Sequence, residues 1–311
     1  MSNFLHRVEW CYFHVLYSLR VLSTPQESAA AVNRHISRIK GAFPRENAKG
    51  VIFFACDIQF MERFGYNLIF SCYETARECG VHVHLYEPSA DILRRLAALK
   101  EQFRDLQLSY TYEDDIDFGS LPERGMYYTA FRFVAARKIM EESKSLLVCL
   151  DADSLIMNSL QRVIATARQH DVGLYFPQRL YLRPKQRAIT QKITAFCVIF
   201  NHTQKSLAFI NFFSALALQF HKRYPRTGTN FWFDQSVLYF SYLLSKRRER
   251  VSFYAIGKSV VDYEFSDQSC IWTARGKRKH DEVFLKESRR VLKKYTAGLD
   301  SQKPLENPSK G

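Results

Sequence analysis

The stretch Leu146-Leu147-Val148-Cys149-Leu150-Asp151-Ala152-Asp153 joins an apolar run to a pair of acidic residues. A short run of this kind is typical of a strand that is buried on both faces of a sheet. The two carboxylates stand two positions apart, so in an extended chain both side chains leave the same side. In open α/β sheets, ligands bind just beyond the carboxyl ends of the strands. We therefore expect Asp151 and Asp153 to lie at a binding site on the rim of a central sheet.

Strand and helix patterns alternate on the N-terminal side of this stretch. Val51–Ala55 is a second short apolar run, and Val81–Leu85 alternates as a strand does. Helical patterns lie between and after them, at 61–79, 91–103 and 126–144. This alternation favours an α/β fold with a mostly parallel sheet and helices on both faces.

Three parts follow from the pattern along the chain. Residues 1–45 predict an N-terminal helical extension, in which Pro25 opens a helix. Residues 46–295 predict the α/β domain, and the polar residues 296–311 predict a disordered tail.

Composition and charge limit the possible partners. The chain has 311 residues, of which 47% are hydrophobic, enough for a large core. Its formal net charge of +14 indicates an anionic partner: nucleic acid, an acidic membrane surface or a diphosphate-bearing substrate. The aromatic residues stand mostly at core spacing, and we expect no nucleic-acid binding.

Cysteine usage and the N-terminus bear on the compartment. The seven cysteines form no C-x-x-C pair, which favours buried free thiols in a reducing, cytoplasmic compartment. Residues 4–22 have the pattern of an aromatic-rich amphipathic helix. Core packing and peripheral membrane contact are the two alternatives for its apolar face.

The acidic pair suits a hard divalent cation. Two carboxylates at a sheet rim are costly to bury without a cation beside them. Mg²⁺ or Mn²⁺ takes one or two protein carboxylates and completes its shell with phosphate oxygens and water. We therefore predict a metal at Asp151 and Asp153 that meets a diphosphate substrate. The alternative is a strand-end turn in which both aspartates only cap backbone groups.

The helix before this strand carries a further part of the pattern. Tyr128-Thr129-Ala130-Phe131-Arg132-Phe133, followed by the apolar strand and Asp-x-Asp, resembles the central block of GT-A glycosyltransferases, most of all the retaining family-8 enzymes. Other segments, over about residues 50–285, are similar to family segments in the same order: Cys56-Asp57, Thr194 to Asn201 with Thr203, Asn230 to Ser236, and Ile271 to Lys279.

This resemblance implies a GT-A-type, Rossmann-like fold and an enzyme that moves a sugar from a nucleotide-diphosphate sugar to an acceptor hydroxyl, with retention. It also implies a role for each matching side chain. Asp151 and Asp153 bind the metal, and Asp151 also contacts the donor. Asp57 contacts the base or ribose, unless it only caps the next helix. The expected diphosphate ligands are Arg132, Lys277, Arg278 and Lys279, and the expected catalytic residues are Asp234 and Gln235.

The sequence departs from the family pattern at two places. Bulky Phe196 stands in Thr194-Ala195-Phe196, where the family has a small Asn-Ser/Ala-Gly cluster. The C-terminal metal-binding histidine of the family has no clean counterpart, and Asp267 and His280 are the nearby candidates.

Three alternatives to a transferase remain open at this stage. A nucleotidyltransferase also uses acidic pairs and a metal, but it usually needs a glycine-rich phosphate loop, and none follows Val51 to Asp57. An inactive protein of the same fold and a basic binding protein are the other two. The sequence leaves the acceptor open among carbohydrate, lipid and protein.

Overall fold

The computed structural model describes residues 19–46, 48–114, 116, 121–177, 192–223, 233–248 and 250–296. The strands are β1 (Lys40–Gly41), β2 (Val51–Cys56), β3 (Gly80–Tyr86), β4 (Leu108–Glu113), β5 (Leu147–Leu150), β6 (Ser154–Ile156), β7 (Val172–Tyr175), β8 (Thr194–Phe200), β9 (Phe253–Ile256), β10 (Val261–Asp262) and β11 (Ile271–Thr273). The helices are α2 (Pro25–Ile36), α3 (Ile58–Phe60), η1 (Met61–Gly65), α4 (Tyr66–Thr75), α5 (Ala90–Gln102), α6 (Leu121–Ser143), α7 (Gln161–Ala167), α8 (Gln204–Arg223), α9 (Phe233–Arg248), η4 (Gly276–His280) and α10 (Glu282–Thr296).

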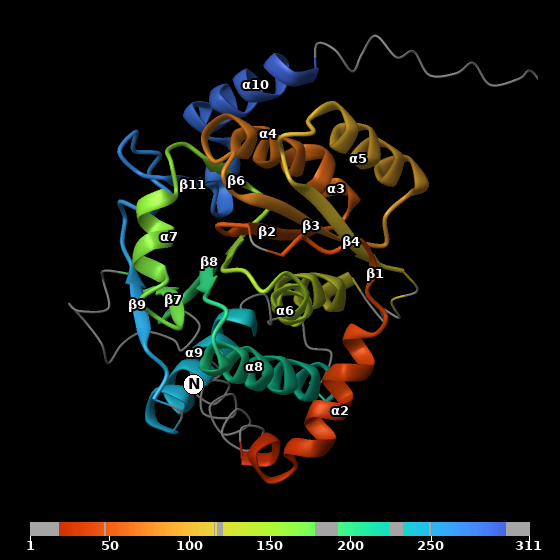
Figure 1. Ribbon diagram of the computed structural model, residues 1–311, viewed down its shortest axis with the longest axis vertical. Helices are drawn as coiled ribbons and strands as arrows, with labels where there is room; N and C mark the ends of the chain where they lie inside the picture. Colours follow the sequence, from red (N-terminus) through yellow and green to blue (C-terminus); the bar gives the residue numbers. More distant parts are fainter. Residues whose placement is uncertain are drawn as a thin grey trace, which may run out of the picture.

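An eight-stranded sheet in the order β1-β4-β3-β2-β5-β8-β7-β9 forms the centre of the molecule. Its middle part, β4-β3-β2-β5, is parallel, whereas β8 runs antiparallel to both β5 and β7. In Figure 1, α4, α5 and α10 cover one face, and α6, α8, α9 and α2 cover the other. The predicted α/β fold with helices on both faces is therefore confirmed, with a mixed sheet.

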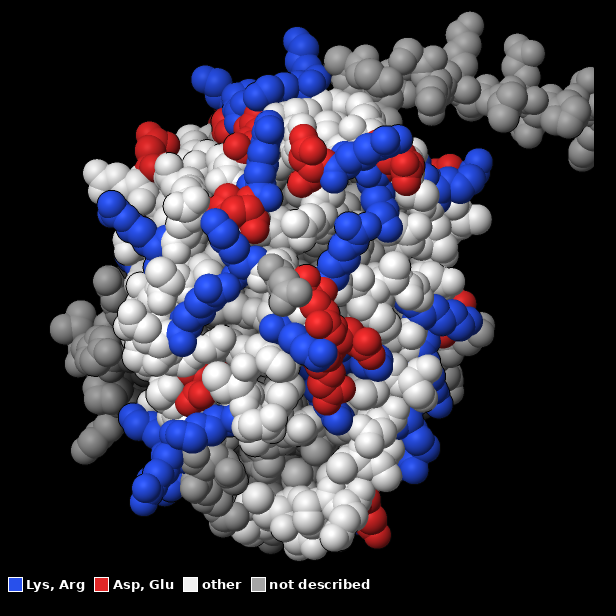
Figure 2. All heavy atoms as spheres, in the orientation of Figure 1, with Lys and Arg blue, Asp and Glu red and all other residues white. Residues whose placement is uncertain are grey.

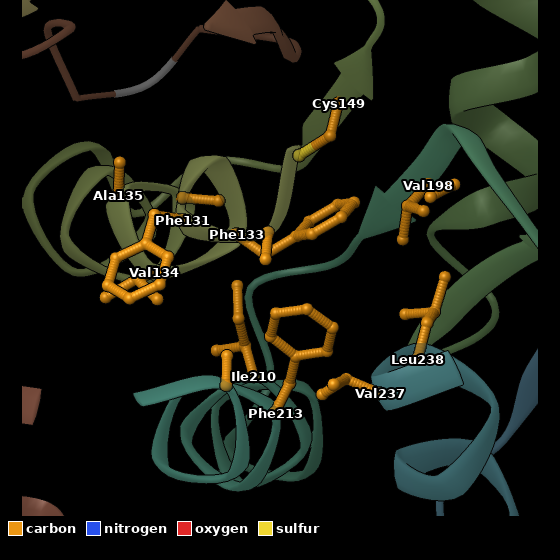
Figure 3. Close-up of a cluster of buried hydrophobic side chains, with 14 of the residues drawn as sticks. Phe131, Phe133, Val134, Ala135, Cys149, Val198, Ile210, Phe213, Val237 and Leu238 are labelled. Carbon is orange, nitrogen blue, oxygen red and sulfur yellow. The ribbon is translucent and has the colours of Figure 1, made fainter. Parts of the chain in front are cut away.

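The alternation of side chains along β2 and β5 explains the two helical layers. Val51 and Phe53 of β2 face the core beneath α6 and α8, together with Leu147 and Cys149 of β5. Their neighbours, such as Ile52 and Val148, face the opposite core beneath α4. Figure 3 shows the first of these cores, where Phe133, Ile210 and Phe213 point toward one another between α6 and α8. A strand buried on both faces requires a continuous apolar run, and this run is what the sequence shows.

Several predicted elements need correction. The helix expected at 61–79 is α4, which ends at Thr75 because the backbone leaves the helical region at Ala76, with φ −138° and ψ 42°. The small sheet β10-β11-β6 and helix α10 were not predicted. Their strands have only two or three residues each, too few to give a periodic pattern. The predicted disordered tail lies outside the described residues except for the end of α10, and so does most of the predicted helix at 4–22.

The surface charge is not gathered in a single patch on the face that Figure 2 shows. Lysine and arginine side chains crowd over α10 at its upper edge, while acidic and basic side chains stand side by side near its middle. Among the described residues, the exposed large hydrophobic side chains are Leu19, Phe60 and Val283. In the described part of the chain, no helix has the length and apolarity that crossing a bilayer requires.

The described cysteines agree with the prediction of free thiols. Cys56, Cys72, Cys79, Cys149 and Cys197 are buried and unbridged, and Cys270 is half-buried. Cys11 lies outside the described residues.

A buried histidine on β3 makes the fold sensitive to acid. The ring of His82 is fully buried between Ser109 Oγ, 2.8 Å from Nδ1, and Thr111 Oγ1, 2.9 Å from Nε2. Burial, followed by the neighbouring His84, lowers the pKa of His82 well below its usual value. His82 therefore becomes protonated near pH 6.5 in the unfolded chain, whereas it stays neutral at this pH in the folded chain.

We expect this difference to lower the free energy of unfolding by about 1.4 kcal/mol between pH 7.5 and pH 5.5. The measurement is urea denaturation of wild type and His82→Asn at both pH values. Since all other groups act in both proteins, the pH-dependent loss should be smaller in the variant by about this amount. Equal losses in the two proteins would show that His82 is not the acid-sensitive group.

Candidate functional site

A pocket of about 510 Å³ opens where β2, β3 and β5 end at their carboxyl edge. This is the position at which parallel sheets bind ligands. The pocket is formed by residues at the ends of these strands and directly after them, by the short helix α3, by one side of α6 and by a single residue from η4. The lining residues are Ala55, Cys56, Asp57, Ile58, Gln59, Phe60, Tyr86, Glu87, Arg124, Gly125, Tyr128, Thr129, Arg132, Asp151, Ala152, Asp153 and Lys279.

Asp151 and Asp153 both line this pocket, as the sequence predicts. The Asp151 side chain is 36% exposed, whereas that of Asp153 is only 6% exposed. Burial, and then the nearby Asp151, raise the pKa of Asp153 to about 6, although Lys279 acts in the opposite direction. The backbone around the pair is fixed, since Asp151 N donates to Phe196 O at 3.0 Å and Ala274 N donates to Asp153 O at 2.9 Å. Two carboxylates are thus held at the pocket wall, the deeper of them away from water.

Arg132 of α6 is the central cation of the site. Its Nη1 donates to Asp151 Oδ1, and its Nη2 donates to Ala195 O at 2.8 Å and to Asp234 Oδ2 at 3.3 Å. The side chain is only 7% exposed. Burial lowers the pKa of Arg132, but the carboxylates of Asp151 and Asp234 outweigh burial and raise it above its usual value. Arg132 therefore stays charged and joins the pocket wall to the first turn of α9.

The predicted basic segment reaches the pocket through one side chain. Lys279 Nζ lies 2.6 Å from Asp153 Oδ2 and over the rings of Phe60 and Phe64, at 4.5 and 5.7 Å from their centroids. Lys277 is exposed, and Arg278 lies over Tyr263 and Phe265. Neither of these two side chains lines the pocket. Of the three basic residues, only Lys279 lies in the pocket with Arg132, Asp151 and Asp153.

Asp57 has the capping role weighed from the sequence, and it also lies at the pocket where the other role, contact with a base or ribose, stays a prediction. Its Oδ1 accepts the Phe60 N–H at 2.8 Å and so caps the short helix α3. The residue also lines the pocket. An aspartate at the end of the first parallel strand is thus held in place by its own cap.

Sequence reasoning missed an aromatic wall beside Asp57. Tyr86 and Tyr128 are stacked with ring centroids 4.7 Å apart, and both line the pocket. Glu87, directly after β3, lines it as well and has a positive φ of 48°. A signal for these residues existed, because Tyr86 ends the parallel strand β3 and Glu87 follows it, as Asp57 follows β2.

Asp234 and Gln235 lie behind the pocket wall and do not line it. Both side chains are buried, and Asp234 reaches the pocket only through Arg132. Asp234 is not the N-cap, because α9 begins at Phe233. Burial raises the pKa of Asp234 to about 6 against the opposing effect of Arg132. Part of the sequence that resembles the family's Asp-Gln segment, from Asn230 to Trp232, lies outside the described residues.

The two departures from the family pattern have structural counterparts. Phe196 is buried against Tyr175, with ring centroids 4.8 Å apart, and does not line the pocket. Its bulk is therefore taken up by the core. Asp267 and His280 do not line the pocket either, so neither takes the place of the family's histidine there.

The donor set of Asp151 and Asp153 fits a hard divalent cation. Their carboxylate oxygens are the ligands that Mg²⁺ and Mn²⁺ prefer. In this structure Lys279 supplies the cation beside the desolvated carboxylate of Asp153. The described residues contain no group of three or more His, Cys, Asp and Glu side chains arranged to hold a metal. An ion at this pair would take its remaining ligands from a substrate and water, as Mg²⁺ commonly does.

Comparison with solved structures identifies the fold. GlyE, a glycosyltransferase of Streptococcus pneumoniae TIGR4, superimposes with a TM-score of 0.50 and 11% identity, over 86% of this chain and 66% of GlyE. An active-site mutant of LgtC superimposes with a TM-score of 0.50 and 12% identity, over 83% of this chain and 98% of LgtC. No family model and no curated protein matches the sequence.

The chain therefore has the GT-A fold of these glycosyltransferases. At 11% and 12% identity, the superposition establishes the fold alone. The reaction has to be inferred from the residues of the site. The chain spans just under two thirds of the length of GlyE, so GlyE has further parts without a counterpart here.

Proposed function

We propose that this chain is a metal-dependent glycosyltransferase that takes a sugar from a nucleoside diphosphate donor and passes it to an acceptor hydroxyl. The observation that carries the proposal is the placement of Asp151 and Asp153 on the wall of one pocket together with Arg132 and Lys279. Acidic pairs bind a divalent ion, and the basic side chains offset the charge of a diphosphate. The retaining outcome stays a prediction of the family resemblance.

The chain's own residues divide the work of binding the donor. Tyr128, which is stacked on the buried Tyr86, offers an aromatic ring on which a base can stack, and Asp57 offers a carboxylate for hydroxyl groups of the ribose. Asp151 and Asp153 would hold Mg²⁺ or Mn²⁺, which would neutralise charge that develops on the leaving diphosphate. Arg132 keeps the Asp151 carboxylate oriented toward the pocket.

The acidic excess of the pocket agrees with a bound cation. Four acidic residues line it, namely Asp57, Glu87, Asp151 and Asp153, against the three basic residues Arg124, Arg132 and Lys279. A pocket of this balance gives a bare diphosphate no net attraction, and a divalent ion that arrives with the diphosphate would offset the acidic excess.

A thermal-shift screen tests the proposal. Nucleoside diphosphates with each common base are added to the protein with Mn²⁺, without it, and with EDTA. At ligand concentrations about 100 times the dissociation constant we expect the melting temperature to rise by roughly 3–6 °C, with Mn²⁺ only. Asp153→Ala should lose this shift, because it removes the deeper carboxylate, whereas a surface variant, Asp105→Ala, should keep it. A wild-type protein that no nucleotide stabilises in the presence of Mn²⁺ would contradict the proposal.

A further inference from the structure

Lys279 lies directly beside Asp153, the more buried of the two predicted metal ligands. Its Nζ lies 2.6 Å from Asp153 Oδ2, in contact with a carboxylate that is almost fully buried. Both residues line the pocket, and an ammonium group at this distance offsets the negative charge of the carboxylate. A divalent ion that approaches Oδ2 meets this positive charge, which opposes its binding.

The position of Lys279 is built by the surrounding structure. β6 begins directly after Asp153, and β11 pairs with it. The chain then continues from β11 into η4, which lies beside the pocket. Gly276, with a φ of +60°, opens η4 in a backbone conformation that favours glycine. Phe60 and Phe64 then hold the ammonium group over their rings. The Lys279 side chain is nevertheless 24% exposed, so it has a route toward the pocket.

We propose that Lys279 competes with the divalent ion for Asp153 and is released by the diphosphate. This inference rests on the proposed function. In the free protein Lys279 neutralises Asp153 and weakens binding of the ion alone. When an ion and a diphosphate enter together, the ammonium group gains the phosphate oxygens as new partners, and Asp153 becomes free to bind the ion. Lys279 is thus a positioning residue that makes the two ligands bind cooperatively.

Electron paramagnetic resonance of Mn²⁺ tests the competition without any turnover. The probes are Mn²⁺ alone and Mn²⁺ with inorganic pyrophosphate, the group that all nucleoside diphosphate donors share. In Lys279→Met we expect Mn²⁺ alone to bind roughly tenfold tighter than in wild type, and pyrophosphate to strengthen Mn²⁺ binding roughly tenfold less. Lys279→Gln, whose amide can still donate to Asp153, should show the same two changes if the methionine variant does not fold. Lys286→Met, which removes an exposed lysine of α10, is the charge-matched control and should behave as wild type.

The outcomes separate the two proposals. If wild type binds Mn²⁺ with pyrophosphate but the Lys279 variants bind Mn²⁺ alone no tighter than wild type, the competition is wrong and the proposed function stands. If no form of the protein binds Mn²⁺ even with pyrophosphate, both proposals are wrong.

Discussion

Replacing Arg132 with leucine should lower the free energy of unfolding by about 3–5 kcal/mol, the usual cost of leaving a buried charge without its partner. Arg132 and Asp234 are 7% and 6% exposed, so neither water nor salt can substitute for the lost ion pair. Leucine also leaves Ala195 O without the guanidinium donor that now lies 2.8 Å away. Asp151, 36% exposed, can regain water and should contribute less to the loss.

Urea denaturation of a double-mutant cycle measures this effect. Asp234→Asn in the Arg132→Leu background removes the stranded charge and should recover about 1–3 kcal/mol. Arg94→Gln is the matched control, because Arg94 pairs with Asp91 on the surface, where the side chains are 77% and 56% exposed. This control should change stability by less than about 1 kcal/mol. Similar losses for Arg132→Leu and Arg94→Gln would show that burial does not govern the Arg132 pair.

The central fold could be predicted from the sequence because its strands carry their pattern locally. Val51 to Ala55 and Leu146 to Leu150 are apolar at every position, as strands covered on both faces must be. The short strands β6 and β11 could not be predicted, because three residues are too few to show a periodic pattern. The two strands pair with each other across a long separation in sequence. The placement of Asp151 and Asp153 followed from strand geometry alone, since a strand end and a two-residue spacing decide it.

The other side chains of the site depend on contacts that span the chain. Arg132 joins Asp151 and Asp234, which lie 19 and 102 positions away from it, and no local pattern reports such a pairing. For the same reason, the sequence predicts the same role, binding of the diphosphate, for Lys277, Arg278 and Lys279. Only the turn at Gly276 and the aromatic rings of Phe60 and Phe64 decide which of the three reaches the pocket.

Asp234→Asn should separate sugar transfer from donor binding. Asp234 lies behind the pocket wall, so the nucleotide sugar that stabilises wild type most should bind the variant within about threefold. The family resemblance implies a catalytic role for Asp234, which would act on the pocket through Arg132. We therefore expect the rate of transfer to fall roughly 10²–10³-fold, the usual loss when one preorganised electrostatic group is removed. Asparagine keeps the shape of the side chain and an oxygen for the Gln235 N–H, now 2.8 Å from Asp234 Oδ1, but it removes the negative charge beside Arg132.

The pH dependence of transfer gives a second measurement on the same carboxylate. Burial raises the pKa of Asp234 to about 6, so the group is ionised at pH 7.5 and takes up a proton as the pH falls through 6. The wild-type rate should therefore decline below pH 6, provided that saturating donor and metal keep the pocket filled. In Asp234→Asn, which has no carboxylate to protonate at this position, the remaining rate should decline less steeply below pH 6 than the wild-type rate does. A variant that transfers sugar at the wild-type rate would remove Asp234 from the mechanism, and would leave the donor pocket of Asp151 and Asp153 unaffected.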